Sequence, residues 1–363
     1  MAEYRFEDIA INSTEKKKPV ESDKEHYLGL EHLDSGTFKV SRFGSEVAPI
    51  GDKLIMKKGD VLFGKRRAYQ KKVAIAPFDG IFSAHGMVLR PKEDVIDKDF
   101  FPLFIASDYF LDAAIKISVG SLSPTINWRD LKELKFNLPE LDEQKKLAEV
   151  LWQIVDTMES YKKLLAKTDE MLKAKFVEMF GLCEHKKLAE ITDIVLGQSP
   201  DSDTYNDKGD GLPFYQGKTE FGDKYVTPKV YCSKPLKIAK PNDVLLSVRA
   251  PVGAVNMTKD KCCIGRGLAA LSFKDSKAND FLFYALKVCE ADIERMGQGA
   301  TFKAITGEQV KNIVIPVAEE NLKNTFINFF QKSEESKAAI QASLDSLSTV
   351  YKKIIAENLG DSN

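Results

Sequence analysis

Apolar residues recur at alternating intervals of four and three in two long stretches of the chain. The first stretch contains Leu147, Leu151, Ile154, Met158, Tyr161, Leu165, Thr168 and Leu172. This is the heptad spacing that lets one face of a helix pack along another helix. Charged residues such as Glu149, Glu159 and Lys163 lie between them, as on a solvated helix face. The pattern predicts a long amphipathic helix within residues 139–182.

A second stretch, within residues 316–360, repeats this spacing through Leu322, Phe326, Phe329, Ile340, Leu344, Leu347, Tyr351 and Ile354. Its middle is polar, because Ser333 and Ser336 stand where apolar residues are expected. These small residues are consistent either with close approach of another helix or with a locally weak seam. If the two seams pair, the connectivity makes the helices antiparallel. We predict pairing through Leu147, Leu151, Ile154, Met158, Leu165, Leu172, Ile340, Leu344, Leu347, Tyr351 and Ile354.

The sequence before each long helix has the pattern of a small globular domain. Short β-type runs, such as 72–76 and 243–248, are separated by glycine and proline. An amphipathic helix is expected near residues 98–117 and again near 279–295. Each half therefore predicts mixed short strands, one surface helix and then a long helix.

The two halves also match each other in order. The matched pairs are Asp60 with Asp243, Gly86 with Gly267, Gly120 with Gly299, Pro139 with Pro316, and Gly181 with Gly360, at offsets of 177 to 183 residues. Recurring strand and turn sequences could produce single matches, but the small drift favours a diverged duplication. We predict an α+β fold of two similar domains, 1–138 and 183–315. Two long antiparallel helices, 139–182 and 316–360, join them as a coiled coil with pseudo-two-fold symmetry.

Charge is balanced overall but concentrated locally. The chain has 53 Lys and Arg residues against 54 Asp and Glu residues. Residues 57–72, however, hold seven basic residues and a single acid, Asp60. A basic loop between two strands can bind phosphates, and Arg or Gln can read base edges. A solvated surface loop is the alternative for this segment. In the second half, the candidate contacts lie in loops rich in glycine and polar side chains, at 197–200, 214–219 and 247–249.

Other classes of function lack their motifs. The five cysteines form no C-x-x-C pair, the four histidines show no metal-ligand spacing, and no phosphate-binding glycine loop or catalytic motif appears. The N-terminal sequence does not resemble a signal peptide, and no apolar run reaches about 20 residues. We therefore expect a cytoplasmic protein that is not an enzyme and holds no metal or cofactor of its own.

Taken together, the repeat, Gly59-Asp60-Val61-Leu62 with Arg66, and the run from Asn242 to Gly253 resemble the specificity (S) subunits of type I restriction–modification systems. Leu138-Pro139 followed by Glu143-Gln144, and Ile315-Pro316 followed by Glu320-Asn321, extend the resemblance over nearly the whole chain. One departure is that the first half lacks a counterpart of Gly197-Gln198-Ser199-Pro200.

The resemblance implies two target-recognition domains, each reading half of a split, asymmetric sequence in double-stranded DNA. It also implies a helical spacer, two methyltransferase (M) subunits docked on the helices, and restriction (R) subunits. S-adenosylmethionine, ATP and magnesium would belong to those partners. The residues expected to bind DNA are Lys65, Arg66, Arg67, Tyr69, Gln70, Gln198, Ser199, Tyr215, Gln216, Lys218 and Arg249.

A duplicated, non-catalytic scaffold that binds proteins through its domains and helices is the main alternative, favoured by the near-zero net charge. A self-sufficient methyltransferase or nuclease is a further alternative, and the missing motifs argue against it. DNA binding and its salt dependence separate the scaffold from the DNA reader.

Overall fold

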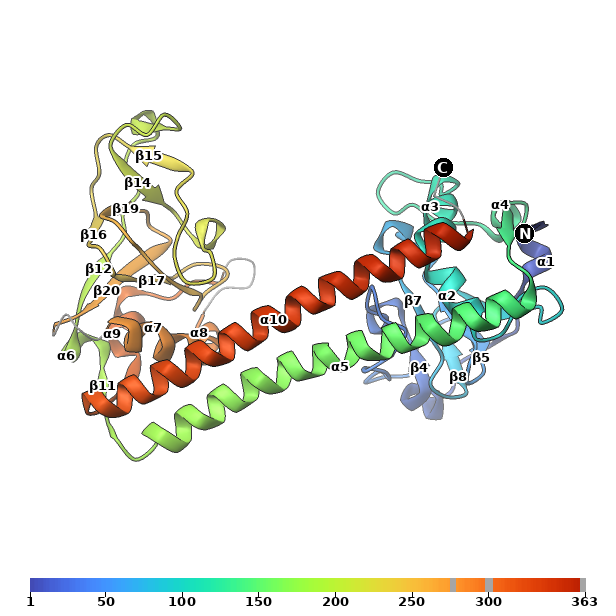
Figure 1. Cartoon of the computed structure of the whole chain (residues 1–363), viewed down its shortest axis with the longest axis horizontal. Coiled ribbons are helices and arrows are strands. Elements are labelled where there is room, and N and C mark those ends of the chain that lie inside the picture. Colours follow the sequence, from blue (N-terminus) through green and yellow to red (C-terminus); the bar gives the residue numbers. More distant parts are fainter. Residues whose placement is uncertain (275–278, 298–302, 360–363) are drawn as a thin grey trace. The chain divides into compact units, whose positions relative to one another are not determined.

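Two helices of equal length carry the heptad seams. In the computed structural model, which describes residues 1–274, 279–297 and 303–359, α5 is Leu141–Phe180 and α10 is Glu320–Leu359, 40 residues each. Both are unbroken ribbons in Figure 1. The chain divides into unit 1, Met1–Lys162 with Gln341–Asn363, and unit 2, Lys163–Ile340. The division falls inside both helices, so each unit contains part of each helix.

Unit 1 builds two four-stranded sheets and one strand pair from short strands. The first sheet has the order β2-β9-β6-β7, the second β3-β5-β8-β4, and β1 pairs with β10. The strands are β1 Ala2–Arg5, β2 Ala10–Ser13, β3 Lys16–Lys17, β4 Tyr27–Leu28, β5 Lys53–Met56, β6 Val61–Phe63, β7 Val73–Ile75, β8 Gly80–Phe82, β9 Met87–Pro91 and β10 Lys135–Leu138. Its helices besides α5 and α10 are α1 Phe6–Ile9, α2 Phe100–Ala106, α3 Asp108–Lys116 and α4 Trp128–Leu131, with short 3-10 turns η1 Glu21–His26, η2 Leu30–His32 and η3 Ala68–Gln70.

Unit 2 repeats this plan. Its sheets have the orders β12-β20-β17-β18 and β13-β15-β14-β19-β16, and β11 pairs with β21. The strands are β11 Glu184–Lys187, β12 Thr192–Leu196, β13 Tyr205–Asn206, β14 Leu212–Tyr215, β15 Val230–Cys232, β16 Ile238–Ala239, β17 Val244–Ser247, β18 Val255–Met257, β19 Cys262–Ile264, β20 Leu268–Phe273 and β21 Val314–Val317. Its further helices are α6 Leu188–Ile191, α7 Asn279–Val288, α8 Glu290–Arg295 and α9 Gly307–Asn312, with turns η4 Ser202–Thr204 and η5 Lys218–Glu220.

The repeat is present in the strand pairing itself. In each unit, the strand after the matched aspartate lies centrally in the first sheet, between the last long strand and its hairpin partner. In each second sheet, one parallel pair, β4 with β8 or β14 with β19, occurs among antiparallel pairs. The predicted architecture of two similar α+β domains joined by two long helices is confirmed.

Two of the matched pairs were aligned wrongly. The amide of Gly86 donates to Ser83 O, and that of Leu268 donates to Gly265 O, so Leu268 rather than Gly267 is the counterpart of Gly86. Phe6 N donates to Leu134 O, and Leu188 N donates to Ile313 O in the same way, so Leu134 and Ile313 are counterparts. Counting five residues on from each gives Ala318, not Pro316, as the counterpart of Pro139. Gly299 and Gly360 lie outside the described residues.

Each predicted surface helix is two helices. The break in unit 1 is at Ser107, whose Oγ accepts from Phe110 N at 3.2 Å and caps α3. The same hydroxyl donates to Phe104 O at 2.6 Å, at the end of α2. A serine that satisfies both helix ends permits the change of direction. In unit 2 the corresponding break lies at Cys289, between α7 and α8.

The long helices complete the core of each unit. In unit 1, Leu151 of α5 and Ile355 and Leu359 of α10 belong to the same buried cluster as the phenylalanines of α2. In unit 2, Phe180 of α5 lies 5.4 Å from Phe326 of α10, centroid to centroid, and 5.1 Å from Phe281 of α7. Aromatic side chains bury large areas, so these contacts tie the helices to the domain.

The predicted seam positions have the following exposure. Leu151, Leu172 and Leu344 are buried, and Leu147, Ile154, Met158, Leu165, Ile340, Leu347, Tyr351 and Ile354 are half-buried. The prediction missed Phe176, Phe180 and Phe330, which are buried. In this part of α10 the buried positions are Phe326, Phe330 and Ser333, while Phe329 is half-buried against the same core and Ser336 is exposed.

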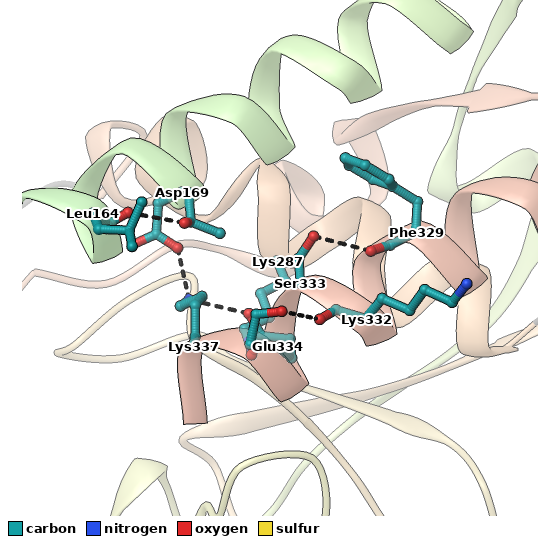
Figure 2. A network of polar contacts seen from close by, with 10 residues as sticks. Leu164, Asp169, Lys287, Phe329, Lys332, Ser333, Glu334 and Lys337 are labelled. Carbon is teal, nitrogen blue, oxygen red and sulfur yellow. Dashed lines mark hydrogen bonds and ion pairs between the residues drawn. The ribbon is translucent and has the colours of Figure 1, made fainter. Parts of the chain in front are cut away.

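The polar middle of α10 is a set of ion pairs within unit 2. Lys337 Nζ lies 2.7 Å from Asp169 Oδ1 of α5 and 3.0 Å from Glu334 Oε1 (Figure 2). Glu334 also pairs with Lys287 of α7, at 3.0 Å. Since Lys337 meets Asp169 while the earlier Phe326 meets the later Phe180, the two helices run antiparallel here.

Ser333 is buried beside this network and donates from Oγ to Phe329 O at 3.0 Å (Figure 2). Its hydroxyl is therefore satisfied inside its own helix. Of the two explanations for the serines, close packing fits Ser333, whereas Ser336 is exposed. Counted from the starts of the two helices, Lys337 corresponds to Met158 of α5, so an ionic contact replaces an apolar one.

The matched aspartates differ in what neutralises them. Asp60 and Asp243 each accept a backbone bond at 2.8 Å, from Lys57 N and Lys240 N. Asp60 also receives two bonds from Arg90, at 2.8 and 2.9 Å. Strand register places Ser272 where unit 1 has Arg90. Asp243 Oδ1 is buried and makes no hydrogen bond within the described part of the chain, and burial raises the pKa of this carboxyl.

These environments predict opposite effects of removing the two charges. Because the pKa of Asp243 is raised in the folded state, stability is lost as the pH rises from the ordinary pKa of an aspartate to the folded pKa, and the loss persists at higher pH. Asp243→Asn should therefore stabilise unit 2 at pH 7 and above, and the gain should vanish as the pH falls toward 4. Asp60→Asn should instead destabilise unit 1 by about 1.5–3 kcal/mol, because it leaves Arg90 without its charged partner.

Hydrogen exchange of the β6 and β17 amides, read by mass spectrometry at increasing urea, measures the two effects separately. Equal destabilisation by both substitutions would contradict the assigned environments.

Candidate nucleic-acid interface

The basic segment forms a rigid loop, Gly64–Lys72, between β6 and β7. Arg67 and Lys71 bracket η3, and both have left-handed backbone conformations, with φ of 54° and 48°. Residues other than glycine rarely adopt this conformation, which costs about 1–2 kcal/mol. Arg67 N donates to Pro124 O at 2.8 Å, and Gln70 N donates to Arg67 O at 2.9 Å. Backbone bonds therefore hold the strained corner in place.

Part of the positive charge in this segment is neutralised within the fold. Lys71 Nζ lies 2.7 Å from both Asp108 Oδ1 and Asp112 Oδ1 of α3. Burial lowers the pKa of Lys71, but the two carboxylates raise it by more, so this ammonium stays charged. Lys57 pairs with Asp79, and Lys72 Nζ donates to Leu30 O at 2.7 Å. Ion pairs thus neutralise Lys57 and Lys71, and the contact with Leu30 O holds the side chain of Lys72 against the fold.

Lys65, Arg66 and Arg67 make no ion pair within the described part of the chain. Arg66 and Arg67 are exposed, and Lys65 is half-buried. Burial, followed by the charge of Lys16, lowers the pKa of Lys65. Burial, followed by Arg66 and Lys65, lowers the pKa of His85. Crowded cations without counterions form a surface suited to an anion. Beside them Tyr69 is exposed and Gln70 is half-buried.

Arg249 occupies in unit 2 the position that Arg66 occupies in unit 1. Each follows the central strand of the first sheet. Arg66 bridges to Thr125 and Arg249 bridges to Ala304. A neighbouring backbone bond is also shared by the two units. Ile126 N donates to Lys65 O at 3.0 Å in unit 1, and Ile305 N donates to Val248 O at 2.9 Å in unit 2. Both arginine side chains are exposed.

The candidate loops of unit 2 meet through glycine. A Cβ on Gly197 would lie 2.1 Å from Gly265 O, and one on Gly267 would lie 2.1 Å from Gln216 O. Only glycine permits such backbone contact. Ser199 Oγ accepts from Arg266 N at 3.3 Å, which joins the first loop to the turn Gly265–Gly267 between β19 and β20. Besides Arg249, the exposed residues on these loops and this turn are Gln198, Gln216, Lys218, Thr219 and Arg266.

Two assignments in unit 2 need correction. Tyr215 was expected at the surface, but it is 3% exposed and packs in a core cluster with Leu245 and Ile264. Burial raises the pKa of its hydroxyl, and the ring is not available to a partner. The sequence analysis did not single out Arg266. Its local signal was a lone cation between two glycines, Gly265 and Gly267.

The described residues contain no group of three or more His, Cys, Asp or Glu side chains arranged to hold a metal ion. The thiols of Cys262 and Cys289 are not activated, since burial raises their pKa values to about 12 and about 11. No helix in the described ranges combines the length and the apolar character needed to cross a bilayer.

Comparison with known proteins identifies the family that this architecture resembles. The profile described as "Type I restriction modification DNA specificity domain" matches residues 5–168 and 182–347. A protein from Methanocaldococcus jannaschii, named as the specificity subunit of the type I restriction enzyme MjaX, is 37% identical over 290 residues, covering 71% of this chain and 68% of that protein. The Escherichia coli EcoDI specificity subunit is 28% identical over 54% of this chain and 45% of its own length.

A solved structure shares the fold across nearly the whole length. A chain from a study of complex assembly and conformational transition of the type I R-M system aligns with a TM-score of 0.64 and 28% identity. The alignment covers 98% of this chain and 97% of that one. The two profile matches correspond to the two halves of the repeat.

The left-handed corner at Arg67 gives a prediction about stability. Arg67→Gly should be more stable than Arg67→Ala by about 1 kcal/mol, because glycine adopts φ of 54° without a steric penalty. Both variants should lose the same charge. Urea unfolding followed by tryptophan fluorescence reports on unit 1, since Trp128 and Trp152 both lie there. Equal stability of the two variants would show that the corner carries no strain.

Proposed function

Because the chain belongs to the type I restriction–modification DNA specificity family, we propose that its two units read the two halves of a split DNA site. The chain is the DNA-recognition subunit of such a complex and not one of its enzymes. Each unit has its own core and its own exposed polar loops, so each can contact DNA through a separate surface. Two different surfaces favour an asymmetric target, since the exposed side chains of the two units differ.

The observation that supports this reading is the equivalence of Arg66 and Arg249. Both extend from the same point of the same topology, each beside further exposed polar or basic side chains. Arginine can form hydrogen bonds with a phosphate or with the edge of a guanine. The side chains beside each arginine would then determine which bases are recognised. The contacts proposed are Lys65, Arg66, Arg67, Tyr69 and Gln70 in unit 1, and Gln198, Ser199, Gln216, Lys218, Arg249 and Arg266 in unit 2.

The long helices are the proposed docking site for methyltransferase subunits. Leu164 and Met171 of α5 lie seven residues apart and are 47% and 46% exposed. Met171 and Val350 occupy equivalent positions of α5 and α10, and Val350 is also 46% exposed. Repeated exposed apolar residues at matched positions suit two copies of one partner. We further propose that the two helices set the number of unread bases, since a 40-residue helix is about 60 Å long.

In such an assembly the chemistry belongs to the partners. S-adenosylmethionine would bind to the two methyltransferase subunits, and ATP with magnesium to restriction subunits that join the complex. This chain would recognise the target sequence and set the distance between its two halves. The alternative is a scaffold that binds only proteins. The cations of unit 1 that make no ion pair favour the DNA reader, because contacts between cations and phosphates dominate the affinity of proteins for DNA.

Methylation patterns test the assignment of one half-site to each unit. Genomic methylation in cells that express the chain with its methyltransferase should reveal a split motif, and the motif should be absent without the chain. Arg66→Gln should relax or abolish recognition in one half of the motif only, and Arg249→Gln in the other half only. Loss of the same bases in both variants, or a continuous motif, would contradict the proposal.

Salt dependence tests the electrostatic surface. The triple substitution of Lys65, Arg66 and Arg67 by Gln should weaken binding to duplex DNA and lower the slope of log K against log salt by roughly 2 to 3. Lys57→Gln is the matched control, since Lys57 lies in the same basic segment but pairs with Asp79. It should change the slope by less than about 1. DNA binding without salt dependence, or none at all with the methyltransferase present, would favour the scaffold.

A further inference from the structure

A short loop of unit 1 holds an apolar side chain at the surface beside the unpaired cations. The loop runs from Val119 to Thr125, between α3 and α4. Leu122 at its tip is 92% exposed and Val119 is 65% exposed. The fold of the free chain buries almost none of the Leu122 side chain. Leaving a leucine in water forgoes the free energy that its burial would contribute.

The base of this loop is fixed by backbone bonds. Val119 N donates to Thr125 O at 3.0 Å, and Thr125 N donates to Val119 O at 2.9 Å. Gly120 has φ of 110°, which turns the chain sharply after Val119. Thr125 Oγ1 donates to Ser123 O at 3.1 Å, and the ring of Pro124 fixes the backbone φ angle at that residue. Leu122 is thus presented on a closed turn with a fixed base.

The same turn is bonded directly to the basic loop. Arg67 N donates to Pro124 O at 2.8 Å, and Ile126 N donates to Lys65 O at 3.0 Å. Arg66 forms an isolated bridge with Thr125. The backbone segments that carry the cations and the leucine therefore move as one piece. A DNA backbone bound by Arg66 and Arg67 would therefore lie next to the turn that carries Leu122.

Building on the DNA-reading function proposed above, we propose that Leu122 inserts as an apolar wedge at a base step of the duplex bound by unit 1. Leucine is among the side chains that proteins insert between base pairs, partly unstacking them and kinking the helix. The surrounding cations attract the phosphates on either side of the step. A protein partner is the less favoured occupant, since a cationic rim matches a polyanion.

The test uses the full chain and a duplex that carries the motif found by methylation mapping, with 2-aminopurine substituted in turn at each step of the half-site read by unit 1. Insertion unstacks a base, so fluorescence at one step should rise on binding. Leu122→Ala should abolish that rise and weaken binding roughly fiftyfold, because the buried side chain loses three carbons. The slope of log K against log salt should stay unchanged, since no charge is removed.

Matched variants separate the wedge from other roles. Leu182→Ala removes a fully exposed leucine from unit 2 and should leave both readouts unchanged. Leu122→Met keeps an apolar side chain of similar size and should keep the fluorescence rise.

Weaker binding of Leu122→Ala with the fluorescence rise retained would overturn insertion. So would unaltered DNA binding with lost methyltransferase assembly, which would assign the loop to a protein partner. If the wild-type chain bound no duplex, the DNA-reading function itself would fail instead.

Discussion

Each domain is completed by side chains from both long helices, and the rest of the structure depends on that packing. In unit 2, Phe180 and Phe326 meet Phe281 of the first surface helix. In unit 1, Leu151 and Leu359 are buried with the phenylalanines of α2. Each core therefore combines residues from distant parts of the sequence. Because the helices contribute to it, they cannot separate from a domain without exposing that domain's core. The loops that carry the proposed DNA contacts therefore rest on a base that is continuous with the helices.

The two units share a backbone plan but balance charge differently. One aspartate keeps its position after the same turn, yet it meets Arg90 in unit 1 and Ser272 in unit 2. Along the helices, an apolar Met158 corresponds to Lys337, which is neutralised by Asp169 and Glu334. Backbone hydrogen bonding and apolar burial are retained in both copies. The polar contacts have diverged around them.

Sequence reasoning identified the helices, the duplication and the basic loop because each has a periodic or local signal. It misaligned Gly86 and Pro139 with their counterparts, since small insertions shift the register and only hydrogen bonds reveal the shift. It assigned Tyr215 to the surface because polar neighbours surround it, whereas β14 is an interior strand of its sheet. It also counted Lys71 as free charge. The partners of Lys71, Asp108 and Asp112, are about 40 residues away in the chain, and no local pattern links them.

The way the loop of unit 1 is fastened has an evolutionary consequence. Its corners are held by the backbone amide of Arg67 and by the ammonium of Lys71. None of the outward side chains at 65, 66, 67 and 69 forms an ion pair within the described residues. If they contact DNA as proposed, replacement of these four side chains would alter what the surface recognises while keeping the backbone bonds that hold the loop. A lineage could acquire new targets by point mutation at a few outward positions, without having to rebuild the scaffold that carries them.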